Sequence, residues 1–569
     1  MKIVVDGQKS SGSPSQDCTD ENERKLKSSD ESYSPTRLIE IENNCQSIRL
    51  IETKDTKQSQ GQNYAALSHS WGVSSAGSRF RTTKDNKDKM KNSIDQAQLP
   101  ATFQDAVAVC RAVGIKYLWI DTFCIIQNDK ADWDRESVKM CDYYGNAYIT
   151  ISGTCSPDSA VPFLRDSDSK RSCSFNPVEF PFMGRKVLVQ RLTAAESEQR
   201  IRNKPRANPK SQDAIDPTKP LLSRAWVFQE NSLSTRVIHF SNEEVLFECT
   251  HGLTSERCTD PPRGTRTIFD RIERWLNRTE DPYRRWQRCV ESYFPLRLTQ
   301  GTDRLPALSG LAESKFKQIR DAPVEGGATA SREEPHYLAG LWKQNLARDL
   351  LWRLNGTDGI ASNEFVAPSW SWASLQGESI HFMASSKSFR SLITFVGVSP
   401  AFAFSKFGKV KEGAYITVSA EAKDTNLVCA VSEVDPLKCR YTLPSLDTAQ
   451  TKLYVCVDTE QGTELLGTKG SMGNWATSQI SQPVTVIVVG EENGMLHGLI
   501  LRRKSGPSSS WYTRIGYFSM GMVHWNIRDG KLKRSETDKK LDDDETERTL
   551  RKCKDTFALG SKLHTFRFY

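Results

Sequence analysis

The fold is decided by residues 99–121, which read LPATFQDAVAVCRAVGIKYLWID. Apolar side chains recur at helical spacing from Phe103 to Val113, and Gly114 follows as a stop signal. The next run, Tyr117–Asp121, is rich in aromatic and β-branched residues and ends in a carboxylate. A helix that leads directly into a short apolar strand is typical of a parallel α/β sheet.

The same alternation continues on both sides of this stretch. Tyr64–Ser68 (YAALS) reads as an earlier strand, and Ala147–Ser152 (AYITIS) reads as a later one. Between them, Asp132 begins a second segment with an apolar face at helical spacing. We therefore expect residues 64–152 to form a parallel sheet with right-handed crossovers and flanking helices at 101–113 and 132–144.

Two hairpins and a strand-rich region are expected outside this core. Residues 37–41 and 48–52 alternate around a polar turn, and residues 236–240 and 245–249 do the same. Amphipathic spacing predicts helices at Ile268–Leu276 and Leu338–Leu354. From residue 415 onward, short apolar runs separated by turn residues predict an antiparallel β domain.

These patterns divide the chain into four parts. Residues 1–35 are polar, with Tyr33 as the sole aromatic residue, so we expect a disordered tail. The remaining boundaries are an α/β domain at 36–235 with an irregular insertion at 156–220, a mixed hairpin and helical segment at 236–380, and a β-rich domain at 381–569.

Composition narrows the classes of function. The chain has 569 residues, with 78 Lys and Arg against 70 Asp and Glu, and this net charge of +8 is too diffuse for a dedicated nucleic-acid binder. No run approaches the roughly 20 apolar residues of a membrane span, and the start, MKIVVDGQKS, lacks the apolar core of a signal peptide. We expect a soluble cytoplasmic protein.

The spacing of the cysteines and the absence of known binding motifs argue against a bound metal or cofactor. The 14 cysteines form no C-x-x-C pair, and many lie in apolar runs, as buried free thiols do. Cys249, His251 and Cys258 have metal-ligand chemistry but match no zinc spacing. The chain has no phosphate-binding loop, dinucleotide fingerprint, nucleophile elbow or zincin motif. We expect no metal and no cofactor.

A site is expected where the parallel strands end, because ligands bind beyond the carboxyl ends of such strands. His69 could act as a base or could pack its ring at the strand end. Asp121 could orient a ligand or cap the following turn. Cys124 could be a nucleophile or an inert core thiol.

Glu230 is the fourth candidate and lies far along the chain, after an apolar run. It could be a general acid or base, or it could form a salt bridge to Arg224 or Arg236. We expect Asp121 and Glu230 to approach one cleft with His69 nearby. Further candidate residues of this cleft are Ser68, Ser70, Trp71 and Cys124. Trp119 and Trp226 are expected to be packing residues.

Several of these segments together resemble the successive blocks of the fungal heterokaryon-incompatibility (HET) domain. The blocks, in the family's order, are YAALSHSWG at 64–72, LPATFQDA at 99–106, YLWIDTFCIIQ at 117–127 with Asp132-Trp133, Met140, Tyr144 and Asn146-Ala147, and RAWVFQE at 224–230. APSWSWAS at 367–374 is similar to a block found downstream of the domain in many members. Phe123 and Ala225 depart from the usual Leu and Gly.

The resemblance implies a role in non-self recognition, in which such proteins trigger growth arrest and cell death after genetically different hyphae fuse. It also implies a fold distantly similar to toll/interleukin-receptor (TIR) domains. Two classes of function follow: a signalling module that binds protein partners and self-associates, or a TIR-like enzyme that consumes NAD or a related nucleotide through a glutamate.

Overall fold

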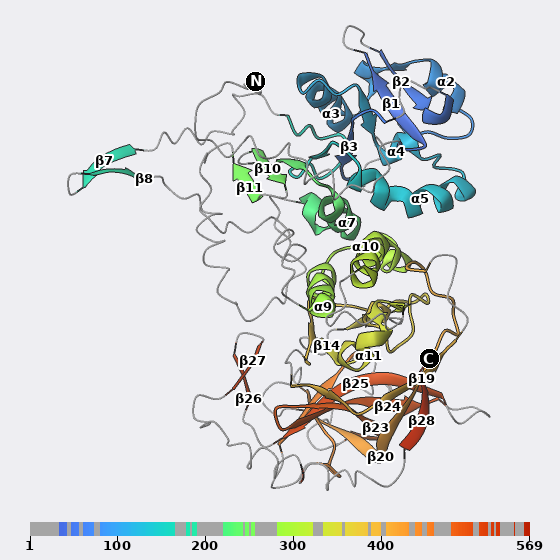
Figure 1. Ribbon diagram of the computed structural model, residues 1–569, viewed down its shortest axis with the longest axis vertical. Coiled ribbons are helices and arrows are strands. Elements are labelled where there is room, and N and C mark those ends of the chain that lie inside the picture. The colour runs from blue at the N-terminus through green and yellow to red at the C-terminus, as the bar shows by residue number, and fades with distance from the viewer. Residues whose placement is uncertain are drawn as a thin grey trace, which may run out of the picture. The chain divides into compact units, whose positions relative to one another are not determined.

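The computed structural model describes the chain in segments. They are residues 33–42, 47–55, 61–72, 80–164, 178–182, 185–189, 220–242, 245–249, 252–255, 281–321, 334–354, 359–384, 388–399, 406–431, 439–446, 452–459, 480–504, 511–521, 525–528, 531–534, 551 and 563–568. The described residues up to 255 belong to one compact unit and those from 281 onward to another (Figure 1). The expected tail at 1–35 lies outside the described residues as far as residue 32.

The first unit is built on a nine-stranded sheet with the order β11-β10-β9-β6-β3-β5-β1-β2-β4. Its four central strands, β9, β6, β3 and β5, are parallel to one another. The predicted parallel pairing of the strands at 64–68 and 117–121 is therefore confirmed. The bounds are β1 Arg37–Ile41, β2 Ser47–Glu52, β3 Tyr64–Ser68, β4 Ile94–Asp95, β5 Tyr117–Trp119, β6 Ile149–Ser152, β9 Val237–Phe240, β10 Val245–Cys249 and β11 Gly252–Ser255.

Antiparallel hairpins extend this sheet at both edges. The predicted hairpin of β1 and β2 forms and pairs with β5. The second predicted hairpin, β9 and β10, also forms, and β9 lies beside β6, so the sheet continues past residue 235. The expected irregular insertion at 156–220 contains a separate hairpin, β7 (Val178–Phe182) with β8 (Arg185–Val189).

Two long helices cover the parallel strands from opposite sides (Figure 1). They are α3 (Ala101–Ala112) and α5 (Lys130–Gly145), close to the predicted ranges. Helix α5 starts two residues before the predicted Asp132, because the Asp129 carboxylate caps it by accepting from the backbone N–H groups of Ala131 and Asp132. The shorter helices of this unit are α2 (Lys87–Asn92), α4 (Asp121–Cys124) and α7 (Ala225–Leu233).

Aromatic packing fills the space between sheet and helices. Trp119, on β5, is 1% exposed and contacts the rings of Tyr143 and Tyr144 on α5 at centroid distances of 5.1 and 5.4 Å. Trp226 lies on helix α7 and not on the strand-like run that its apolar neighbours suggested, and it packs half-buried against the same core. Both tryptophans thus occupy packing positions.

A buried ion pair ties β1 to the segment that follows β5. The Arg37 guanidinium donates to both oxygens of Asp132 at 2.9 and 2.8 Å and to the carbonyl oxygen of Cys124 at 2.8 Å. Asp132 is fully buried and also accepts from the Ile126 N–H at 2.8 Å. Burial alone would raise the pKa of Asp132, but the hydrogen bonds from Arg37 and Ile126 and the charge of Arg37 lower it.

The second unit begins with helices and very short strands. Its main helices are α9 (Pro282–Tyr293) and α10 (Ser309–Arg320). The predicted helix at 338–354 is wrong: the stretch forms β12 (Tyr337–Leu338), β13 (Leu341–Trp342), α11 (Leu346–Asp349) and β14 (Trp352–Leu354). Ala339 and Gly340 interrupt it with φ of 44° and 98°, which no helix tolerates. The other predicted helix, at 268–276, lies outside the described residues.

A block of tryptophans follows these short strands. Trp370 and Trp372 are fully buried, and the Trp372 ring occupies the space that a Cβ on Gly340 would need, 2.6 Å from the indole nitrogen. Glycine is therefore required at position 340 by both its φ and this approach. The remaining short strands here are β15 Ile360–Ala361, β16 Leu375–Gln376 and β17 Ile380–Phe382.

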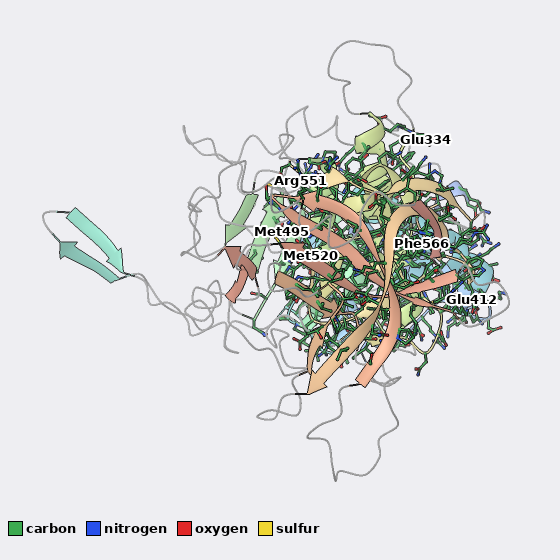
Figure 2. The ribbon with its side chains drawn as sticks, turned by 90° about the horizontal axis from the view of Figure 1, so that it is seen from below. Glu334, Glu412, Met495, Met520, Arg551 and Phe566 are labelled. Atoms are coloured by element: carbon green, nitrogen blue, oxygen red, sulfur yellow. The ribbon has the colours of Figure 1, made fainter. Side chains whose placement is uncertain are left out.

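The predicted β-rich region is a sheet whose strands close into a ring. The long strand β20 (Ile416–Val431) pairs with β28 (Leu563–Phe568) along its first part and with β23 (Ile480–Glu492) along its second. Strands β24 (Met495–Arg503) and β25 (Trp511–Gly521) complete the ring between β23 and β28. Figure 2 shows these strands with Met520 and Phe566, both buried. Further strands are β18 Arg390–Ser391, β19 Thr394–Val398, β21 Cys439–Thr442, β22 Lys452–Val457, β26 Trp525–Arg528 and β27 Lys531–Arg534.

The helices that the structure describes include none long and apolar enough to cross a membrane.

Truncating Trp119 should remove much of the stability of the first unit. Trp119→Ala should lower its free energy of unfolding by about 3–5 kcal/mol, because it deletes a fully buried indole. Denaturant unfolding followed by circular dichroism measures this loss. Trp133→Ala, which truncates a half-buried indole on α5, should cost less; equal midpoints for Trp119→Ala and the unmodified protein would contradict the packing role.

Breaking the buried ion pair between Arg37 and Asp132 should lower the free energy of unfolding about as much as truncating Trp119. Asp132→Asn should lower the free energy of unfolding by about 3–5 kcal/mol, because it leaves the buried Arg37 guanidinium with only the more distant Glu52 carboxylate, at 3.8 Å, as its ion-pair partner. The double variant Arg37→Met, Asp132→Leu should recover part of this loss in the same urea titration, since it removes both charges. A double variant that is less stable than Asp132→Asn would show that the charges themselves stabilise the unit.

Candidate functional site

Three segments that are remote in sequence meet at one edge of the parallel sheet. Strand β3 ends at Ser68 and leads into His69, and β5 leads into Asp121, the first residue of α4. Because β3 and β5 are parallel, both segments emerge at the same edge. Helix α7 contacts β3 and α5 and contributes Glu230. We call Ser68, His69, Trp71, Asp121, Arg224 and Glu230 the strand-end cluster.

Asp121 is held in a fixed orientation by hydrogen bonds. One carboxylate oxygen accepts from the Trp71 indole N–H at 2.8 Å. The other accepts from the backbone N–H and the hydroxyl of Thr122 at 2.6 and 3.0 Å. The side chain is 20% exposed, so this carboxylate combines fixed geometry with access to solvent. It also starts α4, so the predicted strand 117–121 ends at Trp119.

His69 is packed into the core beneath Asp121. Its ring makes an edge contact with Phe103 at 4.9 Å between centroids, and Nε2 lies 3.3 Å from the Thr122 hydroxyl and 3.7 Å from Asp121. Burial lowers the pKa of His69 and outweighs the opposite influence of Asp121. His69 is therefore neutral. It makes both the ring packing and the polar contacts that the sequence had offered as alternatives.

Glu230 is a buried carboxyl group of the cluster whose pKa is raised. It is 7% exposed, and burial raises its pKa to about 7. The negative charge of Asp121 also raises this pKa, whereas the positive charge of Arg224 lowers it. A carboxyl group that titrates near neutral pH can either donate or accept a proton under physiological conditions.

Several polar atoms at this site are buried without a hydrogen-bond partner among the residues that the structure describes. They are Oγ of Ser68, Oε2 of Glu230 and both side-chain polar atoms of Asn231, the residue after Glu230. Asn231 is completely buried. Such atoms cost free energy in a folded protein, and native proteins usually keep them for a reason other than stability. Placement of a polar ligand group here would satisfy them.

Arg224 and Tyr144 connect the cluster to its supports. The Arg224 guanidinium donates to the carbonyl oxygen of His69 at 2.7 Å, and the Tyr144 hydroxyl donates to that of Leu67 at 3.0 Å. Sequence reasoning treated Arg224 only as an ion-pair partner and did not select Tyr144 or Thr122. The residue types of Arg224, Tyr144 and Thr122 and their positions in the sequence gave no sign of these contacts.

Two candidate residues lie apart from the polar contacts. Cys124 is fully buried in the hydrophobic core, and burial raises the pKa of its thiol to about 12, which is the environment of an inert cysteine. Ser70 is half-buried beside Trp71. Among the residues that the structure describes, no group of three His, Cys, Asp or Glu side chains could hold a metal ion. Cys249 ends β10, and His251 and Cys258 lie outside the described residues.

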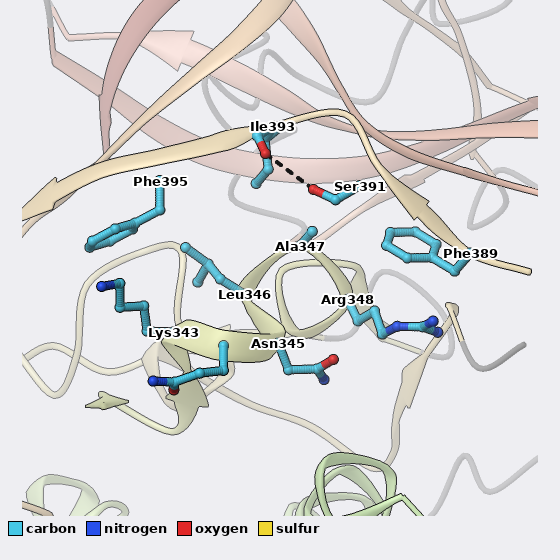
Figure 3. A pocket seen from close by; sticks show the side chains of 10 residues that line it. Lys343, Asn345, Leu346, Ala347, Arg348, Phe389, Ser391, Ile393 and Phe395 are labelled. Atoms are coloured by element: carbon cyan, nitrogen blue, oxygen red, sulfur yellow. Dashed lines mark hydrogen bonds between the residues drawn. The ribbon is translucent and has the colours of Figure 1, made fainter. Parts of the chain in front are cut away.

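The second unit contains cavities of its own. One, of about 290 Å³, lies between α11 and the segment from Phe389 to Phe395 (Figure 3). Lys343 lies 5.1 Å from the centre of the Phe395 ring, and Arg348 lies 4.6 Å from that of Phe389. The ten residues lining it include these two cations and no carboxylate.

The chain was compared with protein-family models, curated proteins and solved structures. Residues 64–230 match the family model described as heterokaryon incompatibility protein (HET). No curated protein and no solved structure matches the chain.

The raised pKa of Glu230 makes stability depend on pH. The folded protein keeps this proton up to about pH 7, whereas the unfolded chain releases it near the ordinary value of 4.5. The free energy of unfolding should therefore decrease by about 3 kcal/mol between pH 4.5 and pH 8. Glu230→Gln, which is neutral throughout, should remove this decrease in urea titrations at several pH values.

Glu42→Gln is the matched control, because Glu42 is an exposed glutamate of the same unit. It should leave the pH dependence unchanged. An identical slope in Glu230→Gln and in the unmodified protein would contradict the raised pKa.

Proposed function

From the match of residues 64–230 to the heterokaryon-incompatibility (HET) family model, we propose that the protein acts in non-self recognition after hyphal fusion. In this proposal it is a fungal cytoplasmic signalling module. Its first unit triggers growth arrest and programmed cell death through protein partners and self-association.

The extent of the family match carries this proposal. The matched span begins at Tyr64, the first residue of β3, and ends at Glu230 itself. It therefore includes all six residues of the strand-end cluster and the parallel strands β3, β5 and β6. The part of the chain shared with the family is the part that places these side chains together.

An enzyme that consumes NAD or a related nucleotide is the second candidate, in keeping with a TIR-like fold. The observation that favours it is the environment of Glu230, a buried carboxyl with a pKa of about 7 and an oxygen that has no hydrogen-bond partner within the described part of the chain. In this role Glu230 would move a proton, and Asp121, oriented by Trp71 and Thr122, would stabilise positive charge on a substrate. NAD would then be a substrate and not a resident cofactor.

Induced expression in a filamentous fungus tests both candidates together. We expect expression of the full chain to arrest growth, with viability and cellular NAD measured in the same cultures. The double variant Glu230→Gln, Asp121→Asn removes both carboxylate charges but keeps the side-chain shapes. Under the signalling proposal this variant stays toxic and NAD remains constant.

Loss of toxicity in the double variant, with NAD falling only in cells that express the unmodified chain, would favour the enzyme instead. Circular dichroism of the purified variant establishes that it is folded. The control Glu42→Gln, Asp134→Asn changes one exposed glutamate and one exposed aspartate of the same unit. Unimpaired growth with the unmodified chain, expressed at a verified level, would contradict the proposed cell-death function.

A further inference from the structure

We propose that the second unit carries a binding site for a small organic anion, with Arg502 as the group that receives the negative charge. The site is a cavity of about 330 Å³, a volume suited to a small molecule. One wall comes from the tryptophan block and its neighbours, with Phe365, Pro368 and Leu375. The opposite wall comes from Arg502 on β24 and Thr513 on β25.

The first wall is rigid because its tryptophans are anchored in the core. The Trp372 indole N–H donates to the Gly340 carbonyl at 3.1 Å. The Ser371 hydroxyl donates to the Ala339 carbonyl at 2.6 Å. The carbonyl of Trp370 accepts from the indole of Trp352 at 3.0 Å. The part of this segment that lines the cavity, including the buried Pro368 and Leu375, therefore has a fixed position before any ligand arrives, which reduces the entropic cost of binding.

The positive charge of Arg514, next to this wall, is neutralised by Asp458. Arg514 lines the cavity and donates to both oxygens of Asp458, at 2.9 and 3.2 Å. Its other guanidinium contacts are the carbonyl oxygens of Leu350 and Trp352. Arg514 and Asp458 are each 3% exposed, so this pair is a structural element that joins the sheet to the tryptophan block.

Arg502 supplies the net charge of the cavity. It is half-buried and lies opposite Thr513 in the pairing of β24 with β25. Its side chain makes no hydrogen bond, ion pair or ring contact with any residue of the described part of the chain. Asp458 is the single carboxylate among the lining residues, and it forms an ion pair with Arg514. The cavity thus presents one uncompensated guanidinium beside an apolar wall.

The chemistry of this arrangement selects the ligand class. A guanidinium binds a carboxylate or a phosphate with two parallel hydrogen bonds. The Phe365, Pro368 and Leu375 side chains offer apolar surface for the body of the same molecule. We therefore assign to the cavity a carboxylate or phosphate ester with a compact apolar or aromatic body.

Calorimetric titration of the full chain tests the assignment with three probes: benzoate, phenyl phosphate and the uncharged benzamide. Both anions should bind saturably and more tightly than benzamide. The tighter anion identifies whether the natural ligand is a carboxylate or a phosphate ester. Arg502→Gln should weaken both anions by about tenfold or more, the loss expected for a hydrogen bond to a charged group.

The neighbouring residue provides the matched control. Arg503 is exposed and follows Arg502 on the same strand, so its side chain points to the opposite face of the sheet. Arg503→Gln removes the same charge and should leave both affinities unchanged within a factor of two. Circular dichroism checks the fold of both variants.

Three results would overturn the proposal. The first is an absence of saturable binding by both anions. The second is equal weakening by Arg502→Gln and Arg503→Gln, which would indicate general attraction to a basic surface. The third is loss of binding in Lys343→Gln, Arg348→Gln, which would place the anion in the other cavity (Figure 3).

Discussion

The bidentate contact between Arg37 and Asp132 is the constraint on which the first unit depends. Arg37 lies on the first strand of the sheet, and its guanidinium also binds the carbonyl oxygen of Cys124. One side chain therefore fixes the end of α4 and the beginning of α5. Asp121 opens α4, and its carboxylate is oriented separately, by the hydrogen bonds from Trp71 and Thr122. A buried pair of this kind adds little net stability, but loss of either partner is costly.

The strand-end cluster lowers the folding stability of the first unit. Burial of a carboxyl beside a second carboxylate, together with an unpaired amide at Asn231, opposes folding, while the surrounding aromatic core favours it. Trp119 and its tyrosine neighbours supply apolar contacts that offset such a penalty. A cluster that served only to hold the sheet together would be better built from apolar side chains.

Sequence patterns predicted the elements that have a regular apolar face or form a short apolar run. Helices α3 and α5 have one apolar face, and the parallel strands β3, β5 and β6 are short apolar runs buried at every position, so both were predicted. Residues 338–354 and 225–233 mix apolar with polar residues, and such short mixed runs do not distinguish a helix from a strand. For the site, strand order placed Ser68, His69 and Asp121 together. The approach of Glu230 could be expected but not its burial, since that depends on how α7 packs on α5.

The ring of strands in the second unit sets an order for the protein's biosynthesis. The first part of strand β20 pairs with β28, which is formed by residues 563–568. The described sheet of the first unit, by contrast, is complete by residue 255. A ribosome releases the chain from its N-terminal side, and domains generally fold as units while they emerge. The first unit can therefore reach its native state while the apolar strands β23, β24 and β25 still lack their final partner. During that interval the edge of β20 that β28 covers in the native sheet is unpaired, and an unpaired strand edge can pair with other chains.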